Sequence, residues 1–314
     1  MLEDQAPLPV SKRPWWQQIF LSPGMNRLRA GWRILGQLLI FFMLLNAVAL
    51  GVGIFFTYQG EADAQNALLW GQLISVIAVT FSVYIACGYL DQRSFTSLGI
   101  RINRQALLDV LAGFLISAVM IAFLFLLMLV FGWLDGVSLN LEQNGQSPLS
   151  MLIFLFIFFA LTGWQEELLV RGYWMQNLAE GLNKPLAVLI TSLVFAFLHA
   201  WNPDAVWSSY LGIFLAGLFF AWAYYKTGRL WLPIALHSGW NFFLGPIFGF
   251  PVSGIDTFRL ITHTARGPAW LTGAAFGPEA GLILAPALLV AALLVSFYAR
   301  SYPPAPANAS QPPL

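Results

Sequence analysis

The chain has 314 residues, of which 59% are hydrophobic and only 9% are charged, and its formal net charge is +1. A typical soluble domain has about 25% charged residues, so the composition indicates a polytopic membrane protein. The near-zero net charge gives no sign of a nucleic-acid partner. The single cysteine, Cys87, excludes an internal disulfide and leaves the redox compartment open.

Long apolar runs separated by turn-forming residues predict an all-α bundle of about eight transmembrane helices. The predicted spans are 34–57, 67–90, 106–131, 149–175, 186–201, 209–225, 230–248 and 279–298. The fifth is short, so we expect it either to end inside the protein or to use flanking residues to reach the surface. On the sixth span, small residues recur four apart, at Gly212 and Ala216 and at Gly217 and Ala221. This spacing predicts the close approach of a neighbouring helix.

The distribution of Lys and Arg predicts the orientation of the chain. Twelve of them lie before the first span or in the loops and tail on its side, whereas only Arg259 and Arg266 lie in the opposite loops. Both termini are therefore expected in the cytoplasm. The organisation we predict is an interfacial segment at 1–33, a membrane domain at 34–298 and a disordered tail at 299–314. Membrane lipid is one expected partner, and the sequence does not indicate an oligomeric state.

Three charged residues interrupt the fourth span. Glu166, Glu167 and Arg171 lie in a run otherwise apolar enough to cross a bilayer, where each charge costs about 2.5–3.5 kcal/mol unless it has a partner. Glu167 and Arg171 are four apart, the favourable spacing for a helix ion pair, while Glu166 points about 100° away. Glu166 is then an additional carboxylate suited to general base and acid catalysis. The alternative is a packing network of ion pairs.

Two of the three histidines also lie in predicted spans. His199 ends the Phe-x-x-x-His sequence of the fifth span, and alone it is more typical of a hydrogen-bonded core residue. His237 and Asn241 are four apart, hence on one face of the seventh span. We expect these side chains and Glu166 to share one cavity, because separate explanations for each buried polar group are less economical.

The order and spacing of these residues resemble a known family. Glu-Glu-x-x-x-Arg at 166–171, Phe-x-x-x-His at 195–199 and His-x-x-x-Asn at 237–241 look like the three motifs of the CPBP family. This family includes the type II CAAX prenyl proteases and the Abi, or bacteriocin-immunity, proteins. The resemblance covers about residues 149–245 and implies hydrolysis of peptide bonds within the membrane.

By this resemblance, Glu166 and His199 would activate the attacking water, and His237 with Asn241 would stabilise the oxyanion. Glu167 and Arg171 would hold Glu166 in place. The substrate would be a membrane-associated protein or peptide, with a CAAX-like carboxyl terminus as the family precedent.

Two questions stay open at the level of sequence. We expect that no cofactor is required, but the family is also labelled metalloprotease, and Glu166, His199 and His237 would be the ligands of a zinc ion if one binds. The alternative function is a non-enzymatic transporter, immunity factor or partner-binding protein that uses the same polar cavity. A transporter would favour repeated halves and broken helices, which the sequence does not show.

Overall fold

The computed structural model describes residues 14–23, 25–59, 64–141 and 147–303. In chain order the elements are α1 (Trp15–Phe20), α2 (Ala30–Gln59), α3 (Ala64–Tyr89), η2 (Phe95–Leu98), α4 (Arg104–Val130), β1 (Leu134–Leu139), α5 (Pro148–Glu167), η3 (Leu168–Trp174), α6 (Met175–Gly181), α7 (Lys184–Leu198), α8 (Trp207–Thr227), α9 (Trp231–Phe242), η4 (Phe243–Ile247), β2 (Ile261–Ala265), α10 (Ala269–Thr272), η5 (Ala274–Phe276), η6 (Pro278–Ala280) and α11 (Leu284–Ser301). The first residues of the predicted amino-terminal segment and most of the predicted disordered tail lie outside the described residues.

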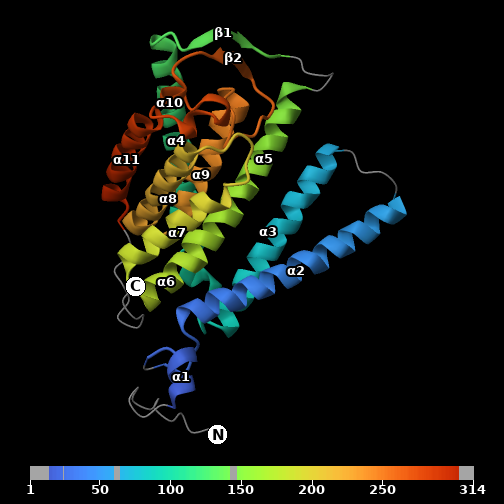
Figure 1. The fold of residues 1–314 in the computed structure, drawn as a ribbon, viewed down its shortest axis with the longest axis vertical. Helices are drawn as coiled ribbons and strands as arrows, with labels where there is room; N and C mark the ends of the chain where they lie inside the picture. Colours follow the sequence, from blue (N-terminus) through green and yellow to red (C-terminus); the bar gives the residue numbers. More distant parts are fainter. Residues whose placement is uncertain (1–13, 24, 60–63, 142–146, 304–314) are drawn as a thin grey trace.

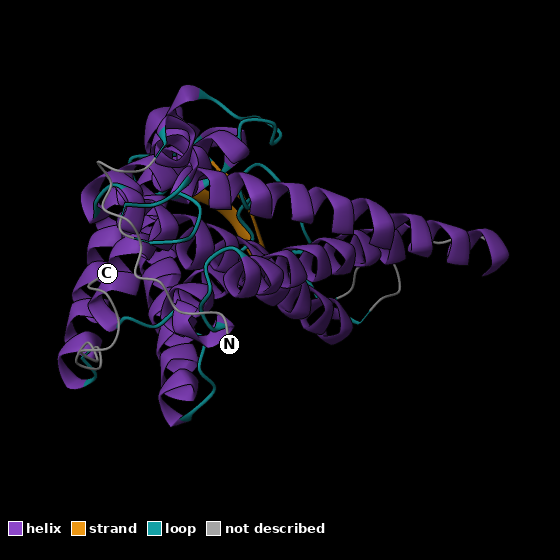
Figure 2. Cartoon of the chain, turned by 90° about the horizontal axis from the view of Figure 1, so that it is seen from below, coloured by secondary structure: helices purple, strands orange, loops and turns teal. Residues whose placement is uncertain are grey.

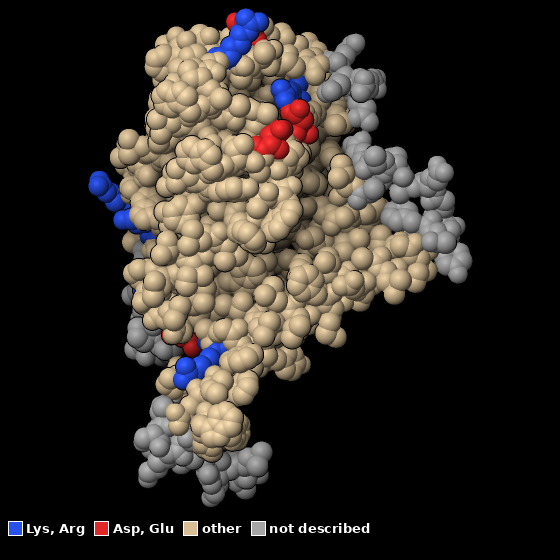
Figure 3. All heavy atoms as spheres, viewed as in Figure 1, with Lys and Arg blue, Asp and Glu red and all other residues tan. Residues whose placement is uncertain are grey.

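The helices form a bundle with an apolar surface. Within the described residues, six helical segments are long and apolar enough to cross a membrane, which makes the chain an integral membrane protein with an all-α fold. On the face drawn in Figure 3, charged side chains lie at the upper and lower parts and at one margin, and most of the surface between them is uncharged. Figure 2 shows how little of the described chain is strand.

Two of the eight predicted spans are too short to cross a bilayer alone. Helix α7 has 15 residues and α9 has 12, although α9 continues directly into the π-helical turn η4. Every residue of α9 from Leu232 to Asn241 is buried, because α4, α5 and α8 surround it. A helix covered on all sides needs apolar residues around its whole circumference, so hydropathy alone does not distinguish it from a membrane span.

A small residue sets how closely α5 approaches α9. A Cβ atom added at Gly163 would lie 2.2 Å from Ser238 Oγ and 2.9 Å from Ile234 O, so only glycine permits this separation. Gly163 precedes Glu166 by one turn, and Ser238 follows His237. The contact therefore brings these two polar side chains to the same level of the bundle.

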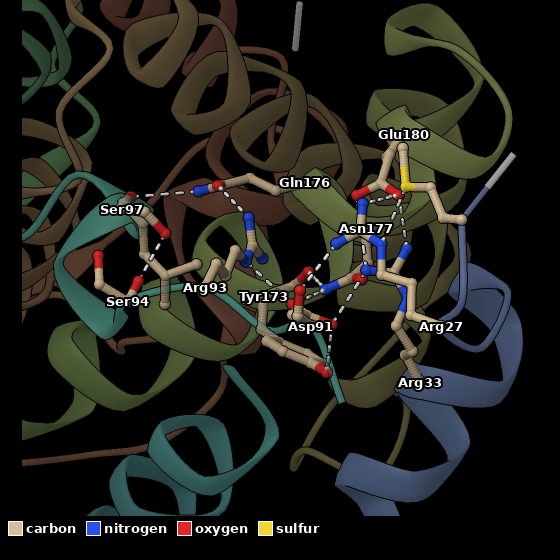
Figure 4. Close-up of polar contacts among 12 residues, drawn as sticks. Arg27, Arg33, Asp91, Arg93, Ser94, Ser97, Tyr173, Gln176, Asn177 and Glu180 are labelled. Atoms are coloured by element: carbon tan, nitrogen blue, oxygen red, sulfur yellow. Dashed lines mark hydrogen bonds and ion pairs between the residues drawn. The ribbon is translucent and has the colours of Figure 1, made fainter. Parts of the chain in front are cut away.

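Helices α2 and α3 form a hairpin that diverges from α5, as Figure 1 shows. Its anchored end is a polar cluster in which the buried Asp91 accepts hydrogen bonds from Arg33, Arg93, Tyr173 and Asn177 at 3.0–3.2 Å (Figure 4). Arg33 is 1% exposed. Arg33, the last residue of the predicted interfacial segment 1–33, pairs with the carboxylates of Asp91 and Glu180 inside the protein.

The connections on the opposite side contain structure that the sequence analysis missed. Strands β1 and β2 pair antiparallel, with Leu134 opposite Ala265 and Leu139 opposite Ile261. The pairing joins the segment after α4 to the long connection between α9 and α11. Short alternating strands give a weaker pattern than membrane helices, which is why both segments were predicted as loops.

Candidate active site

A cavity of about 470 Å³ lies among α2, α3, α5, α7, α8 and α9. Glu166, His199, His237 and Asn241 all line it, so the structure brings the four predicted catalytic side chains together. The wall formed by α2 is apolar, with Leu38, Phe41 and Phe42, whereas α3 contributes Gln72, Ser75 and Val79. The cavity thus joins a polar end, at the four predicted catalytic side chains, to a more apolar region beside α2.

Glu166 lies between two imidazole rings. Its Oε2 atom is 3.8 Å from His237 Nε2 and 4.0 Å from His199 Nε2. These separations are too long for direct hydrogen bonds, and Oε2 has no hydrogen-bond partner among the described residues. The Glu166 side chain is 28% exposed, against 17% for His199 and 7% for His237, and it lines the cavity, although its Oε2 atom is itself buried.

The hydrogen bond made by Nδ1 of each histidine fixes the orientation of its imidazole ring. His199 Nδ1 lies 2.8 Å from Phe195 O, and a carbonyl oxygen only accepts, so Nδ1 donates. His237 Nδ1 lies 2.9 Å from Glu167 Oε1, and its ring stacks on Phe220 with centroids 5.0 Å apart. Both Nε2 atoms therefore face Glu166. This arrangement fixes orientation and tautomer together.

The ion pair predicted from the sequence is present and fully buried. Glu167 Oε1 lies 2.7 Å from Arg171 Nη1, although residues 168–174 form a π-helical turn instead of the predicted α-helix. Arg171 also donates to Gly217 O at 3.1 Å, and its guanidinium lies 4.2 Å above the ring of Phe195. Glu167 thus contacts Arg171 and His237 through one oxygen. Its bond to His237 was not foreseen, because it depends on how α5 and α9 pack.

Sequence reasoning also missed a third carboxylate. Glu279 lines the cavity and accepts a hydrogen bond from Trp240 Nε1 at 3.1 Å. Trp240 stands between His237 and Asn241 on α9. The only signal in the sequence is an acidic residue in Gly-Pro-Glu-Ala-Gly, directly before the last apolar run. The sequence analysis made Glu279 the first residue of the eighth span, whereas α11 begins at Leu284.

The distances between the candidate ligand atoms show whether the site suits a zinc ion. Ligand atoms bound tetrahedrally at about 2.0–2.1 Å from zinc lie about 3.3–3.4 Å from one another. The two Nε2 atoms are farther than this from Glu166 Oε2, and no group of three His, Cys, Asp or Glu within the described residues is spaced to hold a metal ion. The side chains as arranged do not fit a tetrahedral zinc ion.

The fold and the site define a membrane-embedded helical protein with a glutamate between two oriented histidines. Residues 148–243 match the family model described as type II CAAX prenyl endopeptidase Rce1-like. This match, over about a third of the chain, supports the resemblance to the CPBP/CAAX protease family read from the three motifs. No curated protein matches the chain. The family supports a CAAX-type protease activity in a lipid environment, with peptides as substrates.

Proposed function

We propose that this protein is an intramembrane endopeptidase in which Glu166 and His199 activate a water molecule for attack on a peptide bond. The observation that carries the proposal is the position of Glu166 Oε2, without a hydrogen-bond partner and facing two imidazole Nε2 atoms at 3.8 and 4.0 Å. A water oxygen about 2.8 Å from both Oε2 and a facing Nε2 would bridge these separations, and neighbouring side chains would move to admit it, because Oε2 is buried.

The reaction follows from the groups that face this water. Glu166 takes a proton from the water as its oxygen attacks the carbonyl carbon, while His199 Nε2 accepts the hydrogen bond of the second proton and aligns the nucleophile. The tetrahedral intermediate carries its negative charge on the former carbonyl oxygen. Protonated Glu166 then donates to the leaving nitrogen, the C–N bond breaks, and the carboxylate is regenerated.

Asn241 and His237 would stabilise the oxyanion. Asn241 is one helical turn beyond His237, and both are buried at the cavity wall. His237 already donates through Nδ1 to Glu167, so its Nε2 donates as well only when the ring carries both protons. Glu167 stabilises that imidazolium directly. In this proposal Glu167 acts through His237.

The apolar wall suggests which substrates the site accepts. Leu38, Phe41 and Phe42 of α2 line the cavity beyond the polar end, together with Val79, Gln72 and Ser75 of α3. A substrate that carries a lipid group near its cleavage site can bury this group there while its peptide reaches Glu166. We therefore propose a membrane-associated, CAAX-like peptide with a prenyl group as substrate, hydrolysed without a metal cofactor.

A paired substrate assay tests the proposal. The purified protein in liposomes is given two peptides of one CAAX-like sequence, with and without a farnesyl group, and products are identified by mass spectrometry. Wild-type protein should cleave the farnesylated peptide, and Glu166→Gln should not. Glu180→Gln is the matched control, because Glu180 pairs with Arg27 and Arg33 in the remote cluster. Equal cleavage by Glu166→Gln and wild type would contradict the proposal.

A further inference from the structure

Glu279 is a buried acid outside the segment that matches the protease family. It lies in the short turn η6, beyond residues 148–243, and is 5% exposed. Burying a carboxylate costs free energy unless hydrogen-bond donors satisfy its oxygens. Its Oε1 accepts from Trp240 Nε1, and its Oε2 accepts from the backbone N–H and the hydroxyl of Ser253. Three donors satisfy both oxygens as acceptors, while burial raises the pKa of the Glu279 carboxyl against the lowering effect of the Ser253 hydrogen bonds.

Ser253 continues this connection toward the other histidine. Its carbonyl oxygen accepts from Asn202 Nδ2 at 3.0 Å, and the Asn202 backbone N–H donates to His199 O at 3.1 Å. Ser253 has a φ of 48°, a left-handed conformation that a residue with a side chain adopts at an energetic cost. The bonds to Glu279 and Asn202 hold it there.

These four residues, Asn202, Ser253, Glu279 and Trp240, form what we call the Glu279 clamp. One end lies three residues beyond His199, and the other lies within α9, three residues beyond His237. The two histidines are otherwise carried by separate elements, the end of α7 and the middle of α9. The clamp therefore links the two elements that carry the histidines facing Glu166.

The packing around η6 keeps the clamp in place. A Cβ atom at Gly212 of α8 would lie 1.7 Å from the backbone oxygen of Glu279, so glycine is required there. The small residues of α8 thus allow two different elements to pack closely against this helix. Gly217 faces Ser192 of α7, as expected for close helices, while Gly212 admits the turn that carries Glu279.

We infer that Glu279 is a positioning residue that holds His199 and His237 at their working distances from Glu166 through Ser253, Asn202 and Trp240. The inference rests on the proposed function for its catalytic consequence, but its structural content stands on the hydrogen bonds alone. It assigns a role to the connection between α9 and α11, which reaches from the opposite side of the bundle into the cavity.

Glu279→Gln tests the inference in two independent ways. The amide keeps one acceptor oxygen, but its NH₂ group places a donor against the donors of Trp240 or Ser253, which releases one side of the clamp. We expect kcat to fall by about 10–100-fold, the range for losing a residue that orients a catalytic histidine, with KM nearly unchanged. Glu180→Gln, the same change in the remote cluster, should leave both constants unaltered.

The second readout needs no activity. The chain has three histidines, so imidazole NMR signals of ¹⁵N-histidine protein report on His199 and His237, with His263 as internal reference. Glu279→Gln should shift the signals of His199 and His237, and Glu180→Gln should shift neither. Ser253→Ala, which keeps the backbone donor, should give the same pattern more weakly and serves if Glu279→Gln does not fold.

The outcomes separate this inference from the proposed function. If wild type and Glu166→Gln cleave equally, the proposed function fails, and the histidine signals still decide whether the clamp exists. If wild type cleaves and Glu166→Gln does not, yet Glu279→Gln retains both kcat and the wild-type histidine signals, the clamp is refuted alone. A change in KM with kcat unaltered would also overturn it.

Discussion

Glu167→Gln is the substitution whose consequences the structure defines most fully. Glu167 Oε1 is shared between Arg171 Nη1 at 2.7 Å and His237 Nδ1 at 2.9 Å, with both charged side chains of the ion pair completely buried. Glutamine has the same shape but no charge. The substitution therefore leaves a buried guanidinium without its counter-charge, while the amide oxygen can still accept from both donors as Oε1 does in the wild type.

The expected loss of stability follows from these contacts. Removing one partner of a buried ion pair costs about 3–5 kcal/mol. Arg171 keeps its bond to Gly217 O and its position over the ring of Phe195, and the latter contact is worth up to about 2 kcal/mol when desolvated. We therefore expect the free energy of unfolding to fall by about 3 kcal/mol, the lower end of this range. Activity should also fall, because a neutral glutamine no longer stabilises the His237 imidazolium, although its oxygen can still accept from Nδ1.

Glu166→Gln is the matched control, since it makes the same chemical change one residue earlier. Glu166 Oε2 has no hydrogen-bond partner within the described residues, so this variant should unfold at nearly the wild-type temperature yet cleave nothing detectable. The assay is thermal unfolding and peptide cleavage for both purified variants in the same detergent. The reasoning is refuted if Glu166→Gln cleaves at close to the wild-type rate while Glu167→Gln is stable and inactive.

Three further outcomes are expected. Asn241→Ala should lower kcat by about 10²–10³ with nearly normal expression, the usual loss for one oxyanion donor, and an unchanged kcat would remove Asn241 from the mechanism. Exhaustive chelation should leave cleavage intact, with no zinc found by elemental analysis; stoichiometric zinc lost together with activity would oppose this. A reporter fused after Leu314 should be located in the cytoplasm, because Lys and Arg concentrate on that side, and an external reporter would overturn the topology.

The sequence was informative where a single helix determines the geometry. The spacing of Glu167 and Arg171 predicts their ion pair, and the spacing of His237 and Asn241 places both on one face of α9. Because charged and imidazole side chains are rare in apolar runs, the sequence also predicts that they share one cavity. The structure places the four predicted catalytic side chains in that cavity.

Contacts between distant segments could not be predicted in this way. The bond from Glu167 to His237 depends on the close approach of α5 and α9 at Gly163, and neither helix specifies the other's rotation. The π-helical turn at residues 168–174 has no distinct local pattern. Glu279 was placed at a span boundary because its donors, Trp240 and Ser253, lie 39 and 26 residues earlier.

The central claim, that Glu166 activates water and does not itself attack the peptide, is tested most directly by a single turnover in ¹⁸O-labelled water. Enzyme in excess over a cleavable peptide is stopped after one turnover, and the product and the peptide containing Glu166 are analysed by mass spectrometry. The account predicts one labelled oxygen in the new carboxyl group and none in Glu166. An unlabelled product, with the label in the Glu166 carboxylate, would contradict it.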